Sequence, residues 1–302
     1  CGTAMTKPIG SLAEDVRVIA SGNLEKSVIP EGNDELGQLM SDVEKMRVSI
    51  KQLTEDLREK ERLKKEMEVA QHIQTVLLPK HPDMQGYDIA ASLQPSEEVG
   101  GDYYDVISVG GYKWIVVGDV SDHGLTSGLV MMMVQTSIHT VLLRHPDIDP
   151  SRLLTYVNKT IYVNIEKMDE AKHMTIVVLA VSKNGHFLFS GLHEDILIWR
   201  KHTKKIEPIR TNGMWIGLEE DISEMLSTDS LDMENGDCMV LYTDGIIEAM
   251  DSEDNFFGQE RLENIVETFG ERSAAEIHKK IMDDLEPYEK PDDVTLFVMK
   301  RL

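Results

Sequence analysis

The sequence is poor in cysteine and in basic residues. Only Cys1 and Cys238 occur among 302 residues, which excludes a disulfide framework and fits a reducing, cytosolic compartment. Lysine and arginine number 31 against 54 acidic residues, giving a formal net charge of −23. This balance argues against a nucleic-acid partner, because phosphate contacts need clustered basic side chains. No uninterrupted apolar run approaches the ~20 residues of a membrane-spanning helix.

Apolar periodicity marks the N-terminal segment. Apolar residues spaced by three and four predict one helical stripe, formed by Ile9, Leu12, Val16 and Ile19. The residues 21–23 break this helix. Asn33 or Asp34 is then the predicted N-cap of a second helix, because both side chains accept hydrogen bonds from first-turn amides.

The second helix carries a coiled-coil pattern. The apolar residues of its seam are spaced alternately three and four residues apart, at Val43, Met46, Ile50, Leu53 and Leu57. Lys60 and Lys64 occupy the next two seam positions, and a stripe in a shifted phase restarts at Leu63. Two interpretations remain, a solvated patch or a register break between two coiled-coil segments. Pro79 ends the helix in either case.

This two-helix unit resembles a HAMP domain. The resemblance is carried by Pro8, the break "SGNLE" and the helix opening "DELGQL", and it covers residues 5–55, followed by a linker helix at 56–79. It implies a parallel homodimer through the HAMP and linker helices. It also implies a transmembrane sensor upstream of Met5, so that the chain is expected to be the cytoplasmic portion of a membrane-anchored protein.

The chain changes character from Tyr87 onward. Strands are predicted at 87–95, 113–120, 174–182, 185–191, 195–200, 205–210 and 292–300, helices at 124–143 and 152–165, and a strand leading into a loop and helix at 237–250. Strands occur in neighbouring pairs rather than in strict alternation with helices. The predicted class is therefore α+β, with antiparallel sheets packed against helices.

Aspartates gather at strand ends and turns in this second part. The four places are Asp102 with Asp105, Asp119 with Asp122, Asp244 with Glu248, and Asp292 with Asp293. A single such acid is most often a turn former or a helix cap. Four such places, three of them directly against an apolar strand, suggest a shared cation, because a carboxylate near a core is costly unless it is paired or bound to a cation. Mg²⁺ and Mn²⁺ prefer oxygen ligands, and two such ions can activate a bridging water for attack on phosphorus.

Residues 70–300 resemble the metal-dependent PPM-type (type 2C) Ser/Thr protein phosphatases, in their SpoIIE-like branch. The motifs that carry the resemblance are "AQHIQTVLLP", "EEVGGDYYDV", "VVGDVSDHGLTSGLVM", "NGMWIGL", "LYTDGIIEAMDSEDNFFGQERL" and "PDDVTLFVMK". The resemblance implies an α-β-β-α sandwich of two antiparallel sheets over residues 80–302. It also implies a site for two Mg²⁺ or Mn²⁺ ions at one edge of this sandwich.

The resemblance also assigns the ligands. Asp119 would bridge both ions, the Val120 carbonyl would bind one, and Asp244 and Asp292 would bind the other. Asp102 would hold a metal-bound water or a weaker ion. Asp293 is a further candidate, since either of two adjacent acids can be the one that points inward.

Two residues of the turn after this strand need separate interpretation. His123 is a general acid for the leaving oxygen or a phosphate contact, while the simpler interpretation is a structural turn histidine. Asp122 stands where the family usually has glycine. Asp tolerates a positive φ better than most residues, but its charge would either tighten the ions or hinder a phosphate.

The implied function is hydrolysis of phosphoserine or phosphothreonine by in-line attack of a metal-bridging hydroxide. The implied partner is a small phosphorylated regulatory protein of the anti-sigma-antagonist type, with control through the helix at 36–78. A catalytically silent signalling scaffold is the first alternative, and Asp122 is its best support. A metal phosphohydrolase acting on a small molecule is the second.

Overall fold

The computed structural model describes residues 3–30, 32, 34–79, 82–182 and 185–302. The chain divides into two compact units, Cys1–Glu66 and Met67–Leu302. The second unit thus includes the last turns of the linker helix. The predicted start of the phosphatase domain at residues 80–81 lies outside the described residues.

The N-terminal unit is built from two helices. Helix α1 spans Thr3–Ala20 and α2 spans Glu35–Leu77. Their shared core is formed by buried residues of α1, the connector and α2, which are Leu12, Ile19, Val28 and Met40. Asp34 caps α2, since its Oδ1 accepts a hydrogen bond from Gly37 N at 3.0 Å. The other predicted cap, Asn33, lies outside the described residues.

Among its described residues, the C-terminal unit contains two antiparallel sheets, as predicted, and each has five strands. The sequence analysis did not predict two of these strands, at Tyr103–Val109 and Asp229–Asp232. One sheet has the order β1-β10-β9-β6-β7 and the other β2-β3-β4-β5-β8. The first comprises β1 (Tyr87–Gln94), β10 (Val294–Arg301), β9 (Cys238–Tyr242), β6 (Ile196–Arg200) and β7 (Lys205–Ile209). The second comprises β2 (Tyr103–Val109), β3 (Tyr112–Val120), β4 (Met174–Val181), β5 (His186–Ser190) and β8 (Asp229–Asp232).

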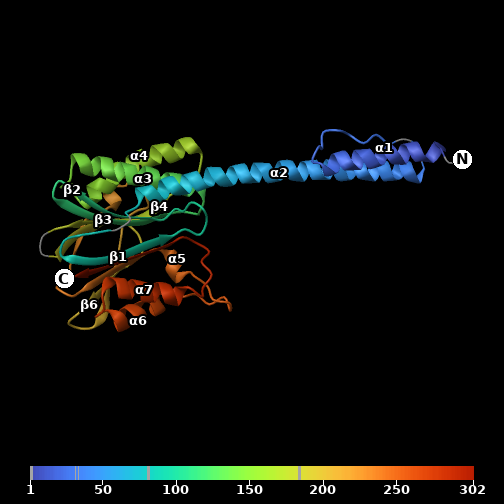
Figure 1. The fold of residues 1–302 in the computed structure, drawn as a ribbon. Helices are drawn as coiled ribbons and strands as arrows, with labels where there is room; N and C mark the ends of the chain where they lie inside the picture. Colours follow the sequence, from blue (N-terminus) through green and yellow to red (C-terminus); the bar gives the residue numbers. More distant parts are fainter. Residues whose placement is uncertain (1–2, 31, 33, 80–81, 183–184) are drawn as a thin grey trace. The chain divides into compact units, whose positions relative to one another are not determined.

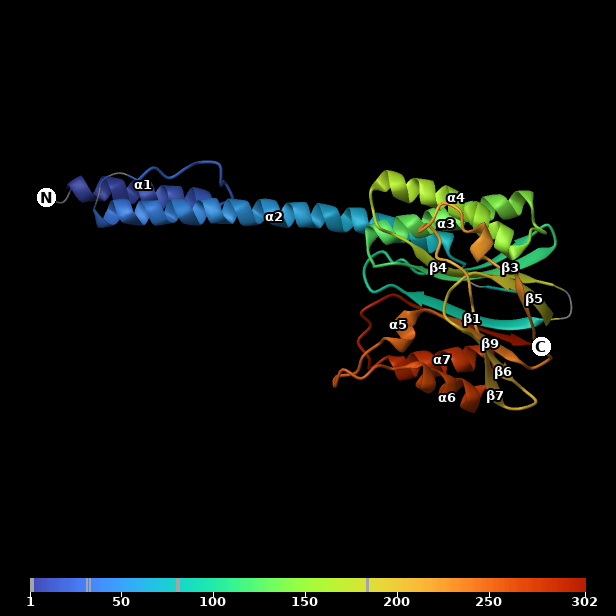
Figure 2. The ribbon, with the colours of Figure 1, turned by 180° about the vertical axis from the view of Figure 1, so that it is seen from behind.

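Helices cover the outer face of each sheet, which gives the predicted α-β-β-α layers (Figure 1 and, from behind, Figure 2). The β2–β8 sheet carries α3 (Leu125–Arg144) and α4 (Pro150–Met168). The β1–β7 sheet carries α6 (Gln259–Phe269) and α7 (Ala274–Leu285). The described residues also form two short helical pieces, the 3-10 helix η2 (Ser223–Met225) and helix α5 (Asp244–Ile247).

Three apolar clusters hold these layers together. Val116 and Leu154 belong to the cluster between the β2–β8 sheet and its helices. Ile277 belongs to the equivalent cluster under α6 and α7. Val117 and Phe297 belong to the cluster between the two sheets. Both sheets are therefore covered on both faces, which explains the nearly continuous apolar runs of their central strands.

The alternation of β3 determines where its terminal aspartate lies. Ile115 and Val117 pack between the sheets, whereas Val116 and Val120 pack under the helices. Since strand side chains alternate between faces, Asp119 follows Val117 on the face between the sheets. β3 ends one residue later, so the carboxylate lies at the edge of the sandwich rather than within it.

Helix α3 is the one helix among the described residues that is long and apolar enough to cross a membrane by length and composition. The sequence analysis predicted a helix at 124–143 but no membrane span, because polar residues interrupt its apolar run. It packs against α4, β2 and β3. Residues such as Val130, Val134 and Ile138 are completely buried there, so packing within the sandwich accounts for its apolarity.

Replacement of Leu154 by alanine is expected to destabilise the C-terminal unit. Leu154 in α4 is completely buried, whereas Leu143 in α3 is 74% exposed. Leu154→Ala removes buried methyl groups and leaves a cavity, so we expect a loss of about 2–5 kcal/mol. Leu143→Ala, the matched control, is expected to change stability by less than about 0.5 kcal/mol. Urea unfolding followed by circular dichroism measures both, and equal losses would contradict this packing.

Candidate metal centre

The predicted acidic residues come from both sheets and meet at one edge of the sandwich. Asp119 is the penultimate residue of β3, and Asp102 immediately precedes β2 in the same sheet. Asp244 opens α5, directly after β9 of the other sheet. Asp292 and Asp293 immediately precede β10, the neighbour of β9. The site therefore depends on the correct packing of one sheet on the other.

Asp102 forms a hydrogen-bonded link between the sheets. Its Oδ2 accepts hydrogen bonds from Thr243 Oγ1 at 2.8 Å and from Thr295 Oγ1 at 2.6 Å. Its Oδ1 is buried and has no hydrogen-bond partner among the described residues. Burial raises the pKa of this carboxyl well above its usual range, against the lowering effect of the two threonines. An unpartnered buried carboxylate oxygen is costly, and a cation would satisfy it.

The carboxyl groups influence one another strongly. Burial, followed by the charges of the four neighbouring acids, raises the pKa of Asp119 from 3.8 to about 10. These neighbours are Asp102, Asp244, Asp292 and Asp293. Burial and the charge of Asp292 likewise raise the pKa of Asp244. The acids that are far apart in the sequence therefore lie close together in the fold.

These acids are close together but do not form a closed ligand shell. Within the described ranges, no group of three or more His, Cys, Asp or Glu side chains is arranged to hold a metal ion. Like-charged carboxylates repel, which opposes their approach to a common point. The charges of Asp102, Asp244, Asp292 and Asp293 nevertheless act on Asp119, so these carboxylates lie within interacting distance of it.

Gly101 brings two of the predicted ligand groups together. A Cβ atom at this position would lie 2.7 Å from the Val120 carbonyl oxygen and 3.3 Å from Asp119 Oδ1. Both atoms thus face the same glycine, whose lack of a side chain leaves room beside them. The oxygen-only donor set, the partnerless oxygen of Asp102 and this space fit a hard divalent cation.

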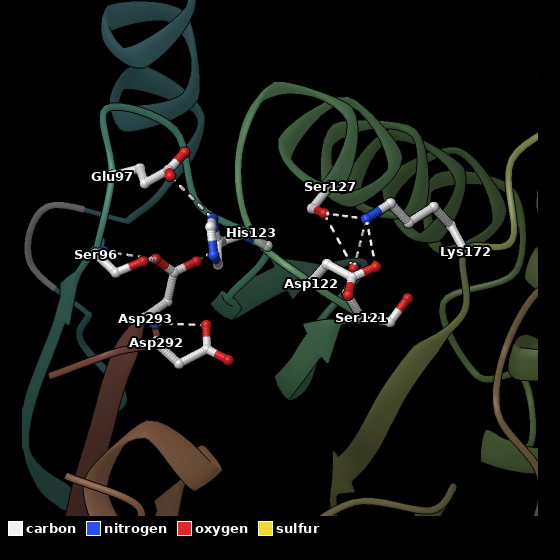
Figure 3. Close-up of polar contacts among 10 residues, drawn as sticks. Ser96, Glu97, Ser121, Asp122, His123, Ser127, Lys172, Asp292 and Asp293 are labelled. Carbon is white, nitrogen blue, oxygen red and sulfur yellow. Dashed lines mark hydrogen bonds and ion pairs between the residues drawn. The ribbon is translucent and has the colours of Figure 1, made fainter. Parts of the chain in front are cut away.

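The two adjacent acids before β10 have different surroundings. Asp293 Oδ1 accepts from Ser96 N at 2.7 Å, and its Oδ2 accepts from Gly101 N at 2.6 Å and Asp102 N at 3.4 Å. Both oxygens therefore hold the loop that leads to β2. Asp292 uses only Oδ1 in a hydrogen bond, with Asp293 N at 2.7 Å, and its carboxylate lies away from the loop (Figure 3).

On one side of the turn, the exposed carboxylate of Asp122 pairs with a buried lysine. The φ of Asp122 is 57°, and its Oδ2 accepts from Lys172 Nζ at 2.9 Å. The same ammonium donates to Ser121 O at 2.9 Å and to Ser127 Oγ at 3.1 Å (Figure 3). Lys172 lowers the pKa of the Asp122 carboxyl. Because Lys172 balances its charge, Asp122 adds less repulsion to the site than its sequence position suggests.

His123 lies beside an acid that the sequence reasoning did not select. Its Nδ1 is 3.1 Å from Glu97 Oε1, and both side chains are about half exposed. Glu97 belongs to the loop that ends at Asp102. The pair therefore connects the turn after β3 with the loop before β2, and it orients the imidazole at the rim of the site (Figure 3).

Sequence reasoning missed Lys172, Glu97, Thr243 and Thr295. A lysine directly before an apolar strand was the one available signal for Lys172, and the others resemble ordinary loop or strand-end residues.

Comparison with known proteins identifies the family. The family model Stage II sporulation protein E (SpoIIE) matches residues 110–302, and the HAMP domain model matches residues 2–52. The chain belongs to the SpoIIE family. It combines a HAMP domain with a phosphatase domain, so the sequence-based family assignment and the prediction of a phosphatase are confirmed.

Individual relatives agree with this assignment. The chain is 27% identical over 245 residues to phosphoserine phosphatase RsbU of Bacillus subtilis. This match covers 79% of the chain and 71% of RsbU. It is also 27% identical to protein IcfG of Synechocystis over an alignment 328 positions long, which covers 98% of the chain but about half (51%) of IcfG.

Among solved structures, the SiaA-PP2C domain of Pseudomonas aeruginosa superposes with a TM-score of 0.67. That match has 18% sequence identity and covers 80% of this chain and 98% of the SiaA domain. At this identity the likeness concerns the fold, and it confirms the predicted sandwich.

Without a divalent ion, the protein is expected to lose stability as the pH rises. The folded-state pKa of Asp119 is about 10, above its ordinary 3.8. Between these values the folded state retains a proton that the unfolded state releases, so this contribution is present below about pH 4 and is lost progressively toward pH 10. Asp119→Asn removes this effect and should raise Tm in EDTA at pH 8, with a much smaller change at pH 4.

Scanning calorimetry at the two pH values measures this difference. Asp283→Asn, at an exposed position of α7, is the matched control and should leave the pH dependence unchanged. A Tm for Asp119→Asn below that of the parent protein at pH 8 would contradict the crowding of the acids.

Proposed function

We propose that the chain is a Mg²⁺- or Mn²⁺-dependent protein serine/threonine phosphatase whose site lies at the edge between the two sheets. The observation that carries this proposal is the partly buried Asp119, whose pKa is raised first by desolvation and then by the charges of acids from both sheets. Such crowding is costly in a protein without a cation. Membership of the SpoIIE family supports the same reaction class.

The proposed ligands are those of the sequence analysis, except that Asp292 is now chosen over the adjacent Asp293. Asp119, the Val120 carbonyl, Asp244 and Asp292 would hold the ions. Asp292 is preferred to Asp293, because both oxygens of Asp293 already accept hydrogen bonds from the loop. Asp102, with one unpartnered oxygen, is suited to a metal-bound water or a weaker ion.

Divalent ions at this site would neutralise phosphate charge and lower the pKa of a bound water. The protein contributes orientation and proton transfer. Glu97 holds the ring of His123 at the rim, where it can donate a proton to the leaving serine or threonine oxygen. Lys172 donates to three protein oxygens, so its proposed task is to fix the turn rather than to bind phosphate.

The proposed substrate is a small phosphorylated regulatory protein of the anti-sigma-antagonist type. The name of the RsbU relative, phosphoserine phosphatase, supports the chemistry. The proposed assembly is a homodimer through the HAMP and linker helices. Exposed apolar residues along α2 support this assembly, and they include Met46, Ile50, Leu53, Leu57 and Ile73. The HAMP match supports control by a membrane-linked sensor, with this chain on the cytoplasmic side.

The alternative of a catalytically silent scaffold is less well supported. Its main argument was the extra negative charge of Asp122, and this carboxylate pairs with Lys172 instead. The charges of Asp102, Asp244, Asp292 and Asp293 all act on Asp119, which supports an ion-binding site rather than a degenerate one. Titration calorimetry with Mn²⁺ separates the two ideas, since a silent scaffold with a degenerate site should bind the ion weakly.

Phosphate release should depend on Mn²⁺ and on the acids of both sheets. Asp119→Ala and Asp244→Ala are each expected to lower kcat on a phosphorylated protein by at least about 100-fold, because each removes an ion ligand. Asp283→Ala on the surface of α7 is the control and should keep full activity. Malachite-green phosphate assays with Mn²⁺ and with EDTA measure the effect. Full activity in either site variant would refute the assignment.

Asp122→Gly should retain most of the activity. Glycine adopts the positive φ of this position without strain, and Lys172 keeps its contacts with Ser121 and Ser127. We expect kcat and Mn²⁺ affinity within about 3-fold of the parent, a change below ~1 kcal/mol. Steady-state kinetics and calorimetry test this expectation. A change of 100-fold in either direction would mean that the Asp122 charge acts directly on the ions.

A further inference from the structure

Gln74 makes a two-point contact with the loop that carries the site. Its side-chain Nε2 donates to the Gly100 carbonyl at 2.6 Å, and its Oε1 accepts from Gly100 N at 3.2 Å. Gln74 lies one turn before the end of α2, in the C-terminal unit, and is only 3% exposed. A side-chain amide can donate to the carbonyl and accept from the N–H of the same backbone residue. An apolar or a charged side chain of similar length cannot do both.

The loop at residues 95–102 has no regular secondary structure. Side chains therefore satisfy its backbone groups, as buried backbone requires. Asp293 binds the amides of Ser96, Gly101 and Asp102, and Gln74 binds both groups of Gly100. The loop is thus held from two directions, by β10 and by α2.

Close packing leaves little room for the loop to adjust. A Cβ atom on Gly100 would lie 2.2 Å from Asp293 Oδ2. A Cβ atom on Gly128 of α3 would lie 2.2 Å from Val99 Cγ1 and 3.2 Å from Gly100 O. A displacement of Gly100 would therefore be transmitted along the loop, because contacts on both sides prevent it from being absorbed locally.

We propose that Gln74 is a positioning residue that ties the last turns of α2 to the metal centre through Gly100. Gly100 is followed by Gly101, which lies against Asp119 and Val120, and then by Asp102. A shift or rotation of this turn of α2 thereby changes the position of the proposed ligands. The proposal rests on the proposed function for its effect on catalysis, whereas the contact itself can be tested without it.

Two substitutions test the contact. Gln74→Met keeps the length of the side chain but removes both hydrogen bonds, and Gln74→Glu replaces the donor to Gly100 O by an acceptor. Gln52→Met, at an exposed position of the same helix, is the matched control. Hydrogen–deuterium exchange of the full chain, read by mass spectrometry in peptides covering 95–102, should become at least about 10-fold faster in both Gln74 variants.

The catalytic consequence is read from metal binding and kinetics. Misplaced ligand groups should weaken Mn²⁺ binding by about 10-fold or more and lower kcat, while KM for the phosphoprotein stays within about 3-fold. Measurements are made below the Tm of each variant, so that loss of folded protein does not contribute. The control should match the parent in all readouts.

Three outcomes separate the possibilities. Faster exchange in 95–102 with weaker Mn²⁺ binding supports the proposal. Unchanged exchange in this segment overturns it, and so does faster exchange with unchanged Mn²⁺ affinity and kcat, because Gln74 would then be only a structural residue. If the parent protein neither binds Mn²⁺ nor releases phosphate, the proposed function fails, while the exchange experiment still decides whether Gln74 holds the loop.

Discussion

Repulsion between carboxylates is the constraint on which the rest of this structure depends. Five acids from strand ends of two sheets lie at one edge, and burial together with their mutual charge raises the pKa of Asp119 to about 10. No packing advantage explains this arrangement, since apolar residues would close the edge at a lower cost. The arrangement makes sense as a site for hard divalent cations, and the family supports that interpretation.

The surrounding residues can be understood as means of holding this unfavourable arrangement in place. Thr243 and Thr295 bind one oxygen of Asp102. Asp293 uses both of its oxygens on the loop before β2. Lys172 stabilises the turn after β3 at a residue with positive φ. Each of these contacts joins segments that are distant in the sequence. The geometry of the site therefore depends on the tertiary structure of the sandwich.

The fold was more predictable from the sequence than the details of the site. Apolar alternation and paired strands indicated antiparallel sheets, and the motifs around Asp119 and Asp244 indicated the family. The helix pattern also located the break after α1 and gave Asp34, alongside Asn33, as a candidate cap of α2, and Asp34 does cap the helix. Local patterns could not reveal that Lys172 pairs with Asp122 or that Glu97 meets His123, because these partners are set by how loops from different strands pack. For the same reason the sequence left Asp292 and Asp293 equivalent, whereas their hydrogen bonds differ.

The link that Asp102 makes between the sheets has a thermodynamic consequence. An ion held by groups from both sheets can bind well only while the two sheets remain packed together. Its binding energy therefore adds to the cohesion of the sandwich as RT ln(1 + [ion]/Kd). Cellular levels of free divalent ions would then set the resistance of this unit to unfolding and proteolysis, in addition to any influence on turnover.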